Sequence, residues 1–166
     1  MNDKIELKQA TIEDAQLLHK LQVEAFLPLY EKYHDDDMSP AKETLKRIIE
    51  KIEEPASEFY LVYFEKEAVG GIRIRHHHKG KKVEHVSWIS PLFIIPAFQG
   101  MGIAQQVIHQ VFSQYPETIT WKLDTIKQET GNCYLYEKCG FVRVGEELVI
   151  NERMTLVEYE KTGSRI

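Results

Sequence analysis

Two glycines, Gly100 and Gly102, stand where an apolar segment gives way to a helix-forming one. The first amides of a helix lack intrahelical acceptors, and the helix dipole adds about half a positive charge there, so such a junction can hold an anion. Glycine permits the backbone angles and the close approach that a phosphate requires. The spacing indicates a phosphate site, although an ordinary strand-to-helix turn also uses glycines. The G-x-G-x-x-G fingerprint is incomplete, because Gln105 occupies the third glycine position.

Tyr136 is the second residue whose type suggests chemistry. A phenol has an ordinary pKa of about 10, so at neutral pH it is protonated and can donate to a departing thiolate. Taken alone, Tyr136 is better interpreted as a packed aromatic side chain of a short helix, as Tyr134 can be. Cys133 and Cys139 lie close by, but neither has a paired histidine in the sequence, so we expect no covalent acyl-enzyme.

The elements that position these residues follow from the periodicity of apolar side chains. Strands are expected at 4–10, 59–64, 69–78, 83–95, 118–124, 141–148 and 154–161, and helices at 12–29, 40–52, 102–115 and 132–138. We expect Pro28 to end or bend the first helix, Ser39 and Pro40 to begin the second, and Pro91 to cause a bulge or an opening in its strand. The order βααβββαβαββ predicts an α/β (α+β) fold with a mixed, mostly antiparallel, twisted sheet of about seven strands between helices on both faces.

The chain has 166 residues and a net charge of −5. This length predicts a single domain over residues 1–166. The acidic balance argues against a nucleic-acid partner, and no apolar run approaches the roughly 20 residues that span a bilayer, so no membrane partner is expected either. Cys133 and Cys139 are too far apart on one helix to form a disulfide. Free thiols without a secretory signal predict a cytoplasmic protein.

Two segments together resemble the signatures of one family. Gln99-x-x-Gly102-x-Ala104 is similar to the Q/R-x-x-G-x-G/A signature of the GNAT N-acetyltransferases. The run from Asn132 to Phe141, which reads N-x-x-x-Y-E-K-x-G-F, resembles a second signature segment of that family. One helix and one strand are expected between the two, as the family requires. The resemblance in architecture covers nearly the whole chain, and it is most specific in these two segments and the stretch between them.

This resemblance implies an acyltransferase that moves the acetyl group of acetyl-coenzyme A to a primary amine by direct attack in a ternary complex, without a metal. Main-chain groups of Ile94 and Ile95 would hold the pantetheine arm, and Tyr136 would protonate the leaving thiolate. The coenzyme A contacts that the family implies are Phe93, Ile94, Ile95, Gln99, Gly100, Met101, Gly102, Ile103, Ala104, Asn132 and Tyr136. The alternative is an acyl-coenzyme A sensor or partner module that binds without turnover.

The general base is harder to assign. Many family members carry a glutamate on the fourth strand, but that position here is Trp88, which cannot accept a proton. Glu84, His85 and Ser90 are the nearby alternatives, and His85 has the ordinary pKa closest to neutral. A histidine on a strand is more often packed or solvated than catalytic. Deprotonation of the acceptor amine through bound water is the alternative.

The acceptor is expected to be a small-molecule or peptide amine near the first two helices. Tyr30, Tyr33, Asp35 and Asp36 are the candidate contacts, although a solvated acidic loop is the preferred interpretation of this segment. The run His76–His78 suggests a metal site, but adjacent strand residues point to opposite faces, so a hairpin tip in solvent is the preferred interpretation. A homodimer is compatible with the family.

Overall fold

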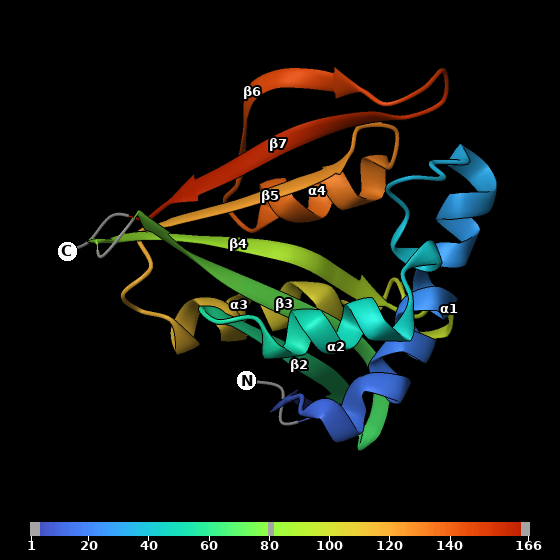
Figure 1. Cartoon of the computed structure of the whole chain (residues 1–166). Helices are drawn as coiled ribbons and strands as arrows, with labels where there is room; N and C mark the ends of the chain where they lie inside the picture. The colour runs from blue at the N-terminus through green and yellow to red at the C-terminus, as the bar shows by residue number, and fades with distance from the viewer. Residues whose placement is uncertain (1–3, 80–81, 164–166) are drawn as a thin grey trace.

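The computed structural model describes residues 4–79 and 82–163, without the side chains of residues 78, 79 and 82–84 (Figure 1). The strands are β1 (Ile5–Gln9), β2 (Ser57–Phe64), β3 (Glu67–Lys79), β4 (Lys82–Ile94), β5 (Thr120–Ile126), β6 (Val142–Val149) and β7 (Thr155–Thr162). The α-helices are α1 (Ala15–Tyr33), α2 (Leu45–Glu53), α3 (Ile103–Gln114) and α4 (Thr130–Lys138), and single 3₁₀ turns lie at Ile12–Asp14, Pro40–Lys42 and Pro96–Phe98.

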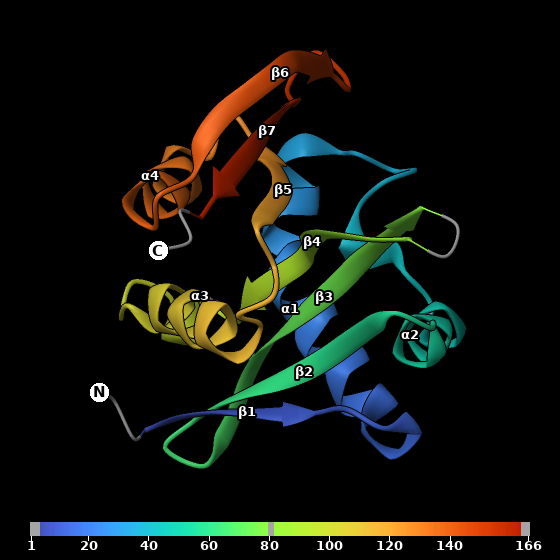
Figure 2. The same ribbon diagram turned by 90° about the vertical axis from the view of Figure 1, so that its left-hand side faces the viewer.

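The seven strands form one sheet in the order β1-β2-β3-β4-β5-β7-β6. Every neighbouring pair is antiparallel except β4 and β5, which run parallel and pair only from Val86↔Thr120 to Trp88↔Lys122. Figure 2 shows α1 and α2 against one face of the sheet and α3 and α4 against the other. The mixed, mostly antiparallel sheet with helices on both faces confirms the predicted fold class.

Beyond Trp88 and Lys122 the two parallel strands separate. The register between β3 and β4 shifts between Ile72 and Ile74, opposite the segment of β4 that contains Pro91. A proline has no amide hydrogen to donate to a neighbouring strand, so an irregularity is expected there. The predicted bulge at Pro91 is therefore confirmed. It lies where β4 begins to part from β5, and we call the space between the diverging strands the β4–β5 opening.

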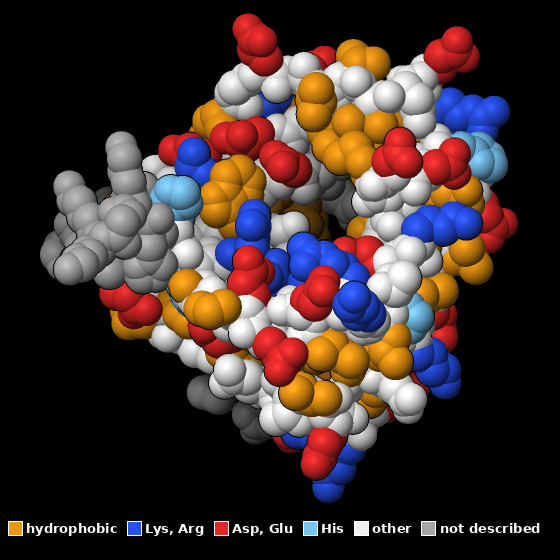
Figure 3. All heavy atoms as spheres, viewed as in Figure 1, with side chains coloured by type: hydrophobic (Ala, Val, Ile, Leu, Met, Phe, Trp, Pro, Cys, Tyr) orange, Lys and Arg blue, Asp and Glu red, His pale blue; other side chains and the backbone are white. Residues whose placement is uncertain are grey.

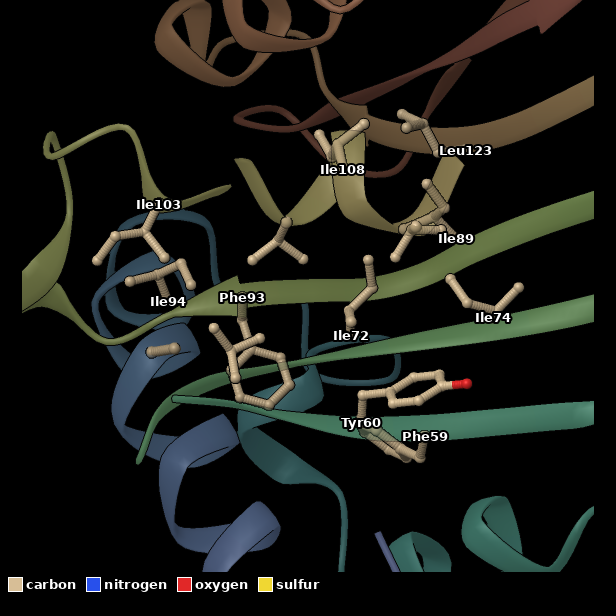
Figure 4. Packing of buried hydrophobic residues seen from close by; sticks show 14 of the residues in the cluster. Phe59, Tyr60, Ile72, Ile74, Ile89, Phe93, Ile94, Ile103, Ile108 and Leu123 are labelled. Carbon is tan, nitrogen blue, oxygen red and sulfur yellow. The ribbon is translucent and has the colours of Figure 1, made fainter. Parts of the chain in front are cut away.

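Apolar side chains from both halves of the sheet pack against the helices (Figure 4). Ile72, Ile89 and Ile108 are buried on the α3 side. On the other side, the rings of Phe26 in α1 and Phe93 in β4 meet edge to face at 5.7 Å. Full burial of such side chains contributes about 1.5–3 kcal/mol each, which fixes the helices that border the β4–β5 opening.

Two helix boundaries differ from the predicted ones. Of the two effects predicted for Pro28, the end of the helix is wrong: α1 continues to Tyr33, because a proline removes only one helical hydrogen bond and surrounding packing can compensate for the loss. Ser39 and Pro40 begin only a short 3₁₀ turn. The N-cap of α2 is Thr44, whose hydroxyl accepts a hydrogen bond from the Arg47 amide at 3.1 Å.

A polar network lies where β4 and β5 are still paired. His76 joins neighbouring strands, with its Nε2 at 2.8 Å from Glu58 Oε1 and its Nδ1 at 3.0 Å from Ser87 Oγ. The Tyr115 hydroxyl, at the end of α3, donates to the same Glu58 oxygen at 2.7 Å. Ser87 Oγ lies 2.9 Å from Thr118 Oγ1 in the segment before β5. We call these five residues the Glu58 network.

The interpretation of His76–His78 as a solvated hairpin tip is wrong for His76. Its ring is partly buried and both of its nitrogens lie within hydrogen-bond distance of protein groups, because β3 lies between β2 and β4, which carry Glu58 and Ser87. The side chain of His78 lies outside the described residues. Within residues 4–79 and 82–163, no group of three histidine, cysteine or acidic side chains is placed to hold a metal.

Cys133 and Cys139 are both buried free thiols. None of the helices in the described part of the chain combines the length and the apolar character that crossing a bilayer requires.

Gly70 is required by the close approach of β3 to β4. A Cβ atom placed on Gly70 would lie 2.0 Å from the carbonyl oxygen of Phe93. We therefore expect Gly70→Ala to lower the free energy of unfolding by about 1–3 kcal/mol, since backbone and not a flexible side chain must move. Urea denaturation measures this change.

Gly131 provides the matched control. A Cβ there meets nothing within 4 Å, and Gly131 lies inside α4. Alanine in a helix is favoured over glycine by about 0.5–1 kcal/mol, so Gly131→Ala should not destabilise the protein. Equal losses of stability for the two variants would contradict the packing argument.

Candidate active site

A cavity of about 610 Å³ borders the diverging end of β4. Its wall is formed by α1, the last residues of β4, the turn before α3, the first residues of α3, and α4. A volume in this range is typical of small-molecule sites. The residues predicted to contact coenzyme A that line it are Phe93, Ile94, Gln99, Gly100, Gly102, Ile103, Ala104, Asn132 and Tyr136.

The turn before α3 has the conformation that the two glycines predict. Gly100 and Gly102 have φ of 76° and 79°, in the left-handed region that favours glycine. A Cβ on either glycine would meet nothing within 4 Å, so the requirement is for backbone conformation and the space beside the turn is open.

The amides of this turn are available to a ligand. No described group accepts a hydrogen bond from the amides of residues 100–105, and the first turn of α3 contains no acidic side chain. Unpaired amides at the positive end of a helix dipole attract an anion. The turn therefore fits a phosphate or a pyrophosphate group.

Main-chain groups of β4 face the β4–β5 opening. The Ile95 amide donates to the Val69 carbonyl at 2.8 Å, so it points toward the neighbouring strand β3. Because main-chain groups alternate in direction along a strand, those of Leu92 and Ile94 point the other way. The Ile94 carbonyl accepts a hydrogen bond from Gln99 Nε2 at 2.8 Å, which ties the glycine turn to β4.

Two members of the predicted coenzyme A set are placed differently. Ile95 cannot offer its N–H to a ligand, because Val69 already accepts it. Met101 is 52% exposed and does not line the cavity. Leu92 does line the cavity, and sequence reasoning missed it. Only the pairing between β3 and β4 reveals which residues of β4 face the opening.

Tyr136 projects from α4 into the cavity wall. Its ring packs against Phe141 at 5.9 Å and Tyr159 at 6.2 Å, and it is 8% exposed, whereas Tyr134 on the same helix is 66% exposed. No hydrogen-bond partner of its hydroxyl is found among the described residues. Burial raises the pKa of Tyr136 above its ordinary value. The hydroxyl is thus protonated at neutral pH and available to a ligand.

One hydrogen-bonded contact spans the cavity between α1 and the start of α4. Glu129 Oε2 accepts from Lys32 Nζ at 2.7 Å and from the Tyr33 hydroxyl at 2.5 Å. Burial raises the pKa of Glu129, but these two hydrogen bonds outweigh burial and leave the pKa below its ordinary value. Lys32 and Glu129 line the cavity, and no motif indicated them because they lie far apart in the sequence.

None of the four predicted acceptor contacts lines this cavity. The Tyr30 hydroxyl donates to Asp36, and the Tyr33 hydroxyl donates to Glu129. Asp35 is buried, and this burial raises its pKa. Tyr30, Tyr33 and Asp36 are therefore bound to partners within the chain.

The predicted base candidates on β4 are dispersed. His85 lies where β4 and β5 are paired, next to Val86, and its carbonyl accepts the Ile119 amide at 2.8 Å. Glu84 lies in β4, but its side chain is outside the described residues. Ser90 is exposed at the start of the β4–β5 opening, yet a hydroxyl is too weak a base to take the proton of an ammonium group.

Sequence reasoning also missed an acidic side chain beside the opening. Asp124 lies on β5 between Leu123 and Thr125, which are both buried, whereas Asp124 is exposed. The alternation of β5 could have indicated that Asp124 faces away from the core. Figure 3 shows this face of the molecule hollowed near its centre, over the interval between β4 and β5 in Figure 1, with acidic and basic side chains around the hollow.

Comparison with known proteins agrees with this geometry. The sequence profile described as the acetyltransferase (GNAT) family matches residues 16–141. No curated protein matches the sequence.

Several solved structures share the fold. A putative phosphinothricin N-acetyltransferase is similar with a TM-score of 0.77 and 14% identity, over 97% of this chain and 99% of that one. Spermidine N-acetyltransferase from Vibrio cholerae, in complex with CoA and spermine, has a TM-score of 0.72 and 19% identity, over 97% and 96%. An acetyl transferase from Salmonella typhimurium that modifies the N-terminal serine of ribosomal protein L7/L12 has a TM-score of 0.73 and 16% identity, over 98% and 97%.

The left-handed conformation of Gly102 leads to a direct test. Gly102→Ala forces a side chain into a backbone region that costs about 1–2 kcal/mol for residues other than glycine, and relief of that strain reorients the amides that follow. We expect the affinity for coenzyme A to fall at least about tenfold in isothermal titration calorimetry.

Gly145 allows strain and binding to be separated. It has φ of 69° on β6, and a Cβ there also meets nothing within 4 Å, but it does not line the cavity. Gly145→Ala should cause a similar loss of stability and leave coenzyme A affinity unchanged. If both variants weakened binding equally, the anion site would lie elsewhere.

Proposed function

The chain belongs to the acetyltransferase (GNAT) family, and we propose that it transfers the acetyl group of acetyl-coenzyme A to a primary amine by direct attack in a ternary complex. Family membership makes it an acyltransferase with acetyl-coenzyme A as its donor. The acceptor and the mechanism are our proposals, as is the assignment of the activity to one domain over residues 1–166.

The observation that carries the proposal is the pairing, within one cavity, of unpaired amides at residues 100–105 with the available hydroxyl of Tyr136. The amides suit the pyrophosphate of coenzyme A. The N–H groups of Leu92 and Ile94 face the β4–β5 opening, where they can bond the pantetheine arm and polarise the thioester carbonyl. Asn132, exposed at the start of α4, borders the same cavity.

Tyr136 serves in this proposal as the general acid. When the amine attacks the acetyl carbon, the C–S bond breaks and sulfur leaves with the electron pair. The Tyr136 hydroxyl donates its proton to that sulfur. Burial raises the pKa of this hydroxyl, but the same apolar surroundings raise the pKa of a thiol beside it, so the two groups remain comparable in proton affinity.

The names of similar structures support an amine acceptor without selecting one. They include spermidine N-acetyltransferase, an enzyme that modifies an N-terminal serine, and a putative phosphinothricin N-acetyltransferase. The net charge of −5 favours an acceptor that carries positive charge. We propose a small-molecule or peptide primary amine.

A library of primary amines that includes spermidine, phosphinothricin and a peptide with an N-terminal serine tests the activity. Release of free thiol from acetyl-coenzyme A should accelerate with at least one amine, and mass spectrometry should show an acetylated product. Saturating acetyl-coenzyme A should also raise the melting temperature. No acceleration with any amine would contradict the proposed function, and an unchanged melting temperature would contradict donor binding.

Tyr136→Phe removes the proposed acid and keeps the ring. We expect kcat to fall about 10²-fold, since general acid catalysis contributes about 10²–10⁴-fold, while the affinity for coenzyme A stays unchanged. Steady-state kinetics and calorimetry measure the two quantities.

Tyr134→Phe is the matched control, because Tyr134 lies on the same helix and is exposed. It should retain full activity. A Tyr136→Phe enzyme as active as the wild type would exclude this residue as the acid. A wild-type protein that bound coenzyme A and acetylated nothing would instead favour the sensor function.

A further inference from the structure

Asp124 occupies a defined place at the β4–β5 opening. The last paired residues of the two strands are Trp88 and Lys122. Asp124 lies two residues further along β5, so it is on the same face as Lys122, at the level where β4 has moved away. Asp124 is not among the residues that line the 610 Å³ cavity, so its place is beside the β4–β5 opening and outside that cavity.

The side chain faces away from α3 and α4. Trp121 and Leu123 point to one face of β5 and are buried there, and the Trp121 ring packs against Phe112 of α3 at 5.5 Å. Asp124 consequently projects from the opposite face of the sheet. This is the hollowed face in Figure 3.

The Asp124 carboxylate has no committed partner in the described part of the chain. The nearby ammonium group of Lys122 lies 3.6 Å from Glu160 and 3.9 Å from Glu158, and it forms no ion pair with Asp124. An acidic side chain that no cation or donor holds is free to take a proton from a ligand.

The charges around Asp124 favour proton uptake. Although the residue as a whole is exposed, the surrounding chain partly desolvates its carboxylate, and this desolvation raises the pKa of Asp124 most. Glu158, which lies opposite Asp124 on β7, raises the pKa further. Arg75 of β3 and Lys122 of β5 lower it, but the net pKa lies above its ordinary value. A carboxylate with a raised pKa is a stronger base than an ordinary one.

Tyr136 and Asp124 lie on opposite sides of the sheet. Tyr136 extends from α4, which covers one face, and Asp124 projects from the other face. An acid and a base on opposite sides can serve the leaving sulfur and the attacking nitrogen at one carbonyl carbon without competing for the same space.

We propose that Asp124, and not a residue of β4, is the general base that deprotonates the acceptor amine; this role rests on the proposed function. Asp124 takes one proton from the ammonium group, directly or through one water. The freed electron pair on nitrogen forms the N–C bond as the C–S bond breaks, and the sulfur takes a proton from Tyr136. The nitrogen loses a second proton as the amide forms, and this proton restores the hydroxyl of Tyr136. The first proton, held by Asp124, passes to solvent.

This assignment defines the acceptor class. The amine arrives as an ammonium ion, because primary alkylamines have pKa values of about 10. The facing carboxylates Asp124 and Glu158 attract that cation and raise its local concentration at the β4–β5 opening. We therefore expect alkylamines to be acetylated and weakly basic aromatic amines to gain little from Asp124.

Asp124→Asn removes the basic oxygen and keeps the shape. At pH 7 we expect kcat/KM to fall about 10²-fold or more with the best alkylamine from the library. The variant must rely on amine that solvent has already deprotonated, so its rate should rise about tenfold per pH unit toward the pKa of the amine. The wild-type rate should instead be nearly flat near neutral pH and fall in acid as Asp124 is protonated.

Folding and donor binding act as internal controls. A raised pKa means that the ionised Asp124 is disfavoured in the folded state, so Asp124→Asn should melt at the same temperature as the wild type or higher at pH 7. Its affinity for coenzyme A should be unchanged. Glu160→Gln, which alters a carboxylate on the same face that is paired with Lys122, should retain activity within about threefold.

Carbon NMR of the side-chain carboxyl gives a readout that is independent of turnover. The midpoint of Asp124 should lie above 3.8 and should fall in Glu158→Gln. An Asp124→Asn enzyme with wild-type rate and pH profile would overturn the proposal, even if Tyr136→Phe were inactive and the acetyltransferase function stood. A wild-type protein that acetylates no amine would overturn the function and this role together.

Discussion

The separation of β4 from β5 is the constraint on which the rest of this molecule depends. Two parallel strands that pair over only three residue pairs leave the main-chain groups of Leu92 and Ile94 without strand partners. The Ile94 carbonyl accepts a hydrogen bond from Gln99, and the remaining groups face the cavity, where a bound molecule can pair with them in place of a strand. A parallel pair also needs a crossover connection, and that connection here is α3, whose first turn is the proposed anion site. The parallel pairing of β4 and β5 thus accounts for the opening between them and for the position of α3 and its first turn beside it.

Most of the fold could be predicted because its signals are local. Alternating apolar residues specify the strands, and the glycine turn is specified by backbone angles that other residues avoid. The start of α2 could not be chosen this way, since Ser39 and Thr44 are both good caps and only packing decides between them. The direction of the Ile95 amide was equally hidden, because it depends on which strand lies beside β4.

Residues of the candidate site were likewise predictable only where they belong to a local motif. Gly102 and Tyr136 stand in contiguous motifs, so the sequence places them without knowledge of tertiary contacts. Asp124 belongs to no motif, and its relevance appears only when the end of the β4–β5 pairing is known. Lys32 and Glu129 are 97 positions apart and meet because the end of α1 reaches the loop between β5 and α4, a contact that no periodicity indicates.

The Glu58 network fixes the end of the sheet at which β4 and β5 are paired. It joins β2, β3 and β4 to the end of α3 and to the segment that leads into β5, at the narrow end of the wedge between the parallel strands. Its hydroxyl, imidazole and carboxyl groups are largely shielded from water, so parting them leaves polar atoms unsatisfied. Each strand residue adds about 3.3 Å, so the network lies several residues away from the segment where β4 and β5 stand apart. Because it connects β4 to the segment before β5, it sets the angle between the two strands and hence the width of the β4–β5 opening.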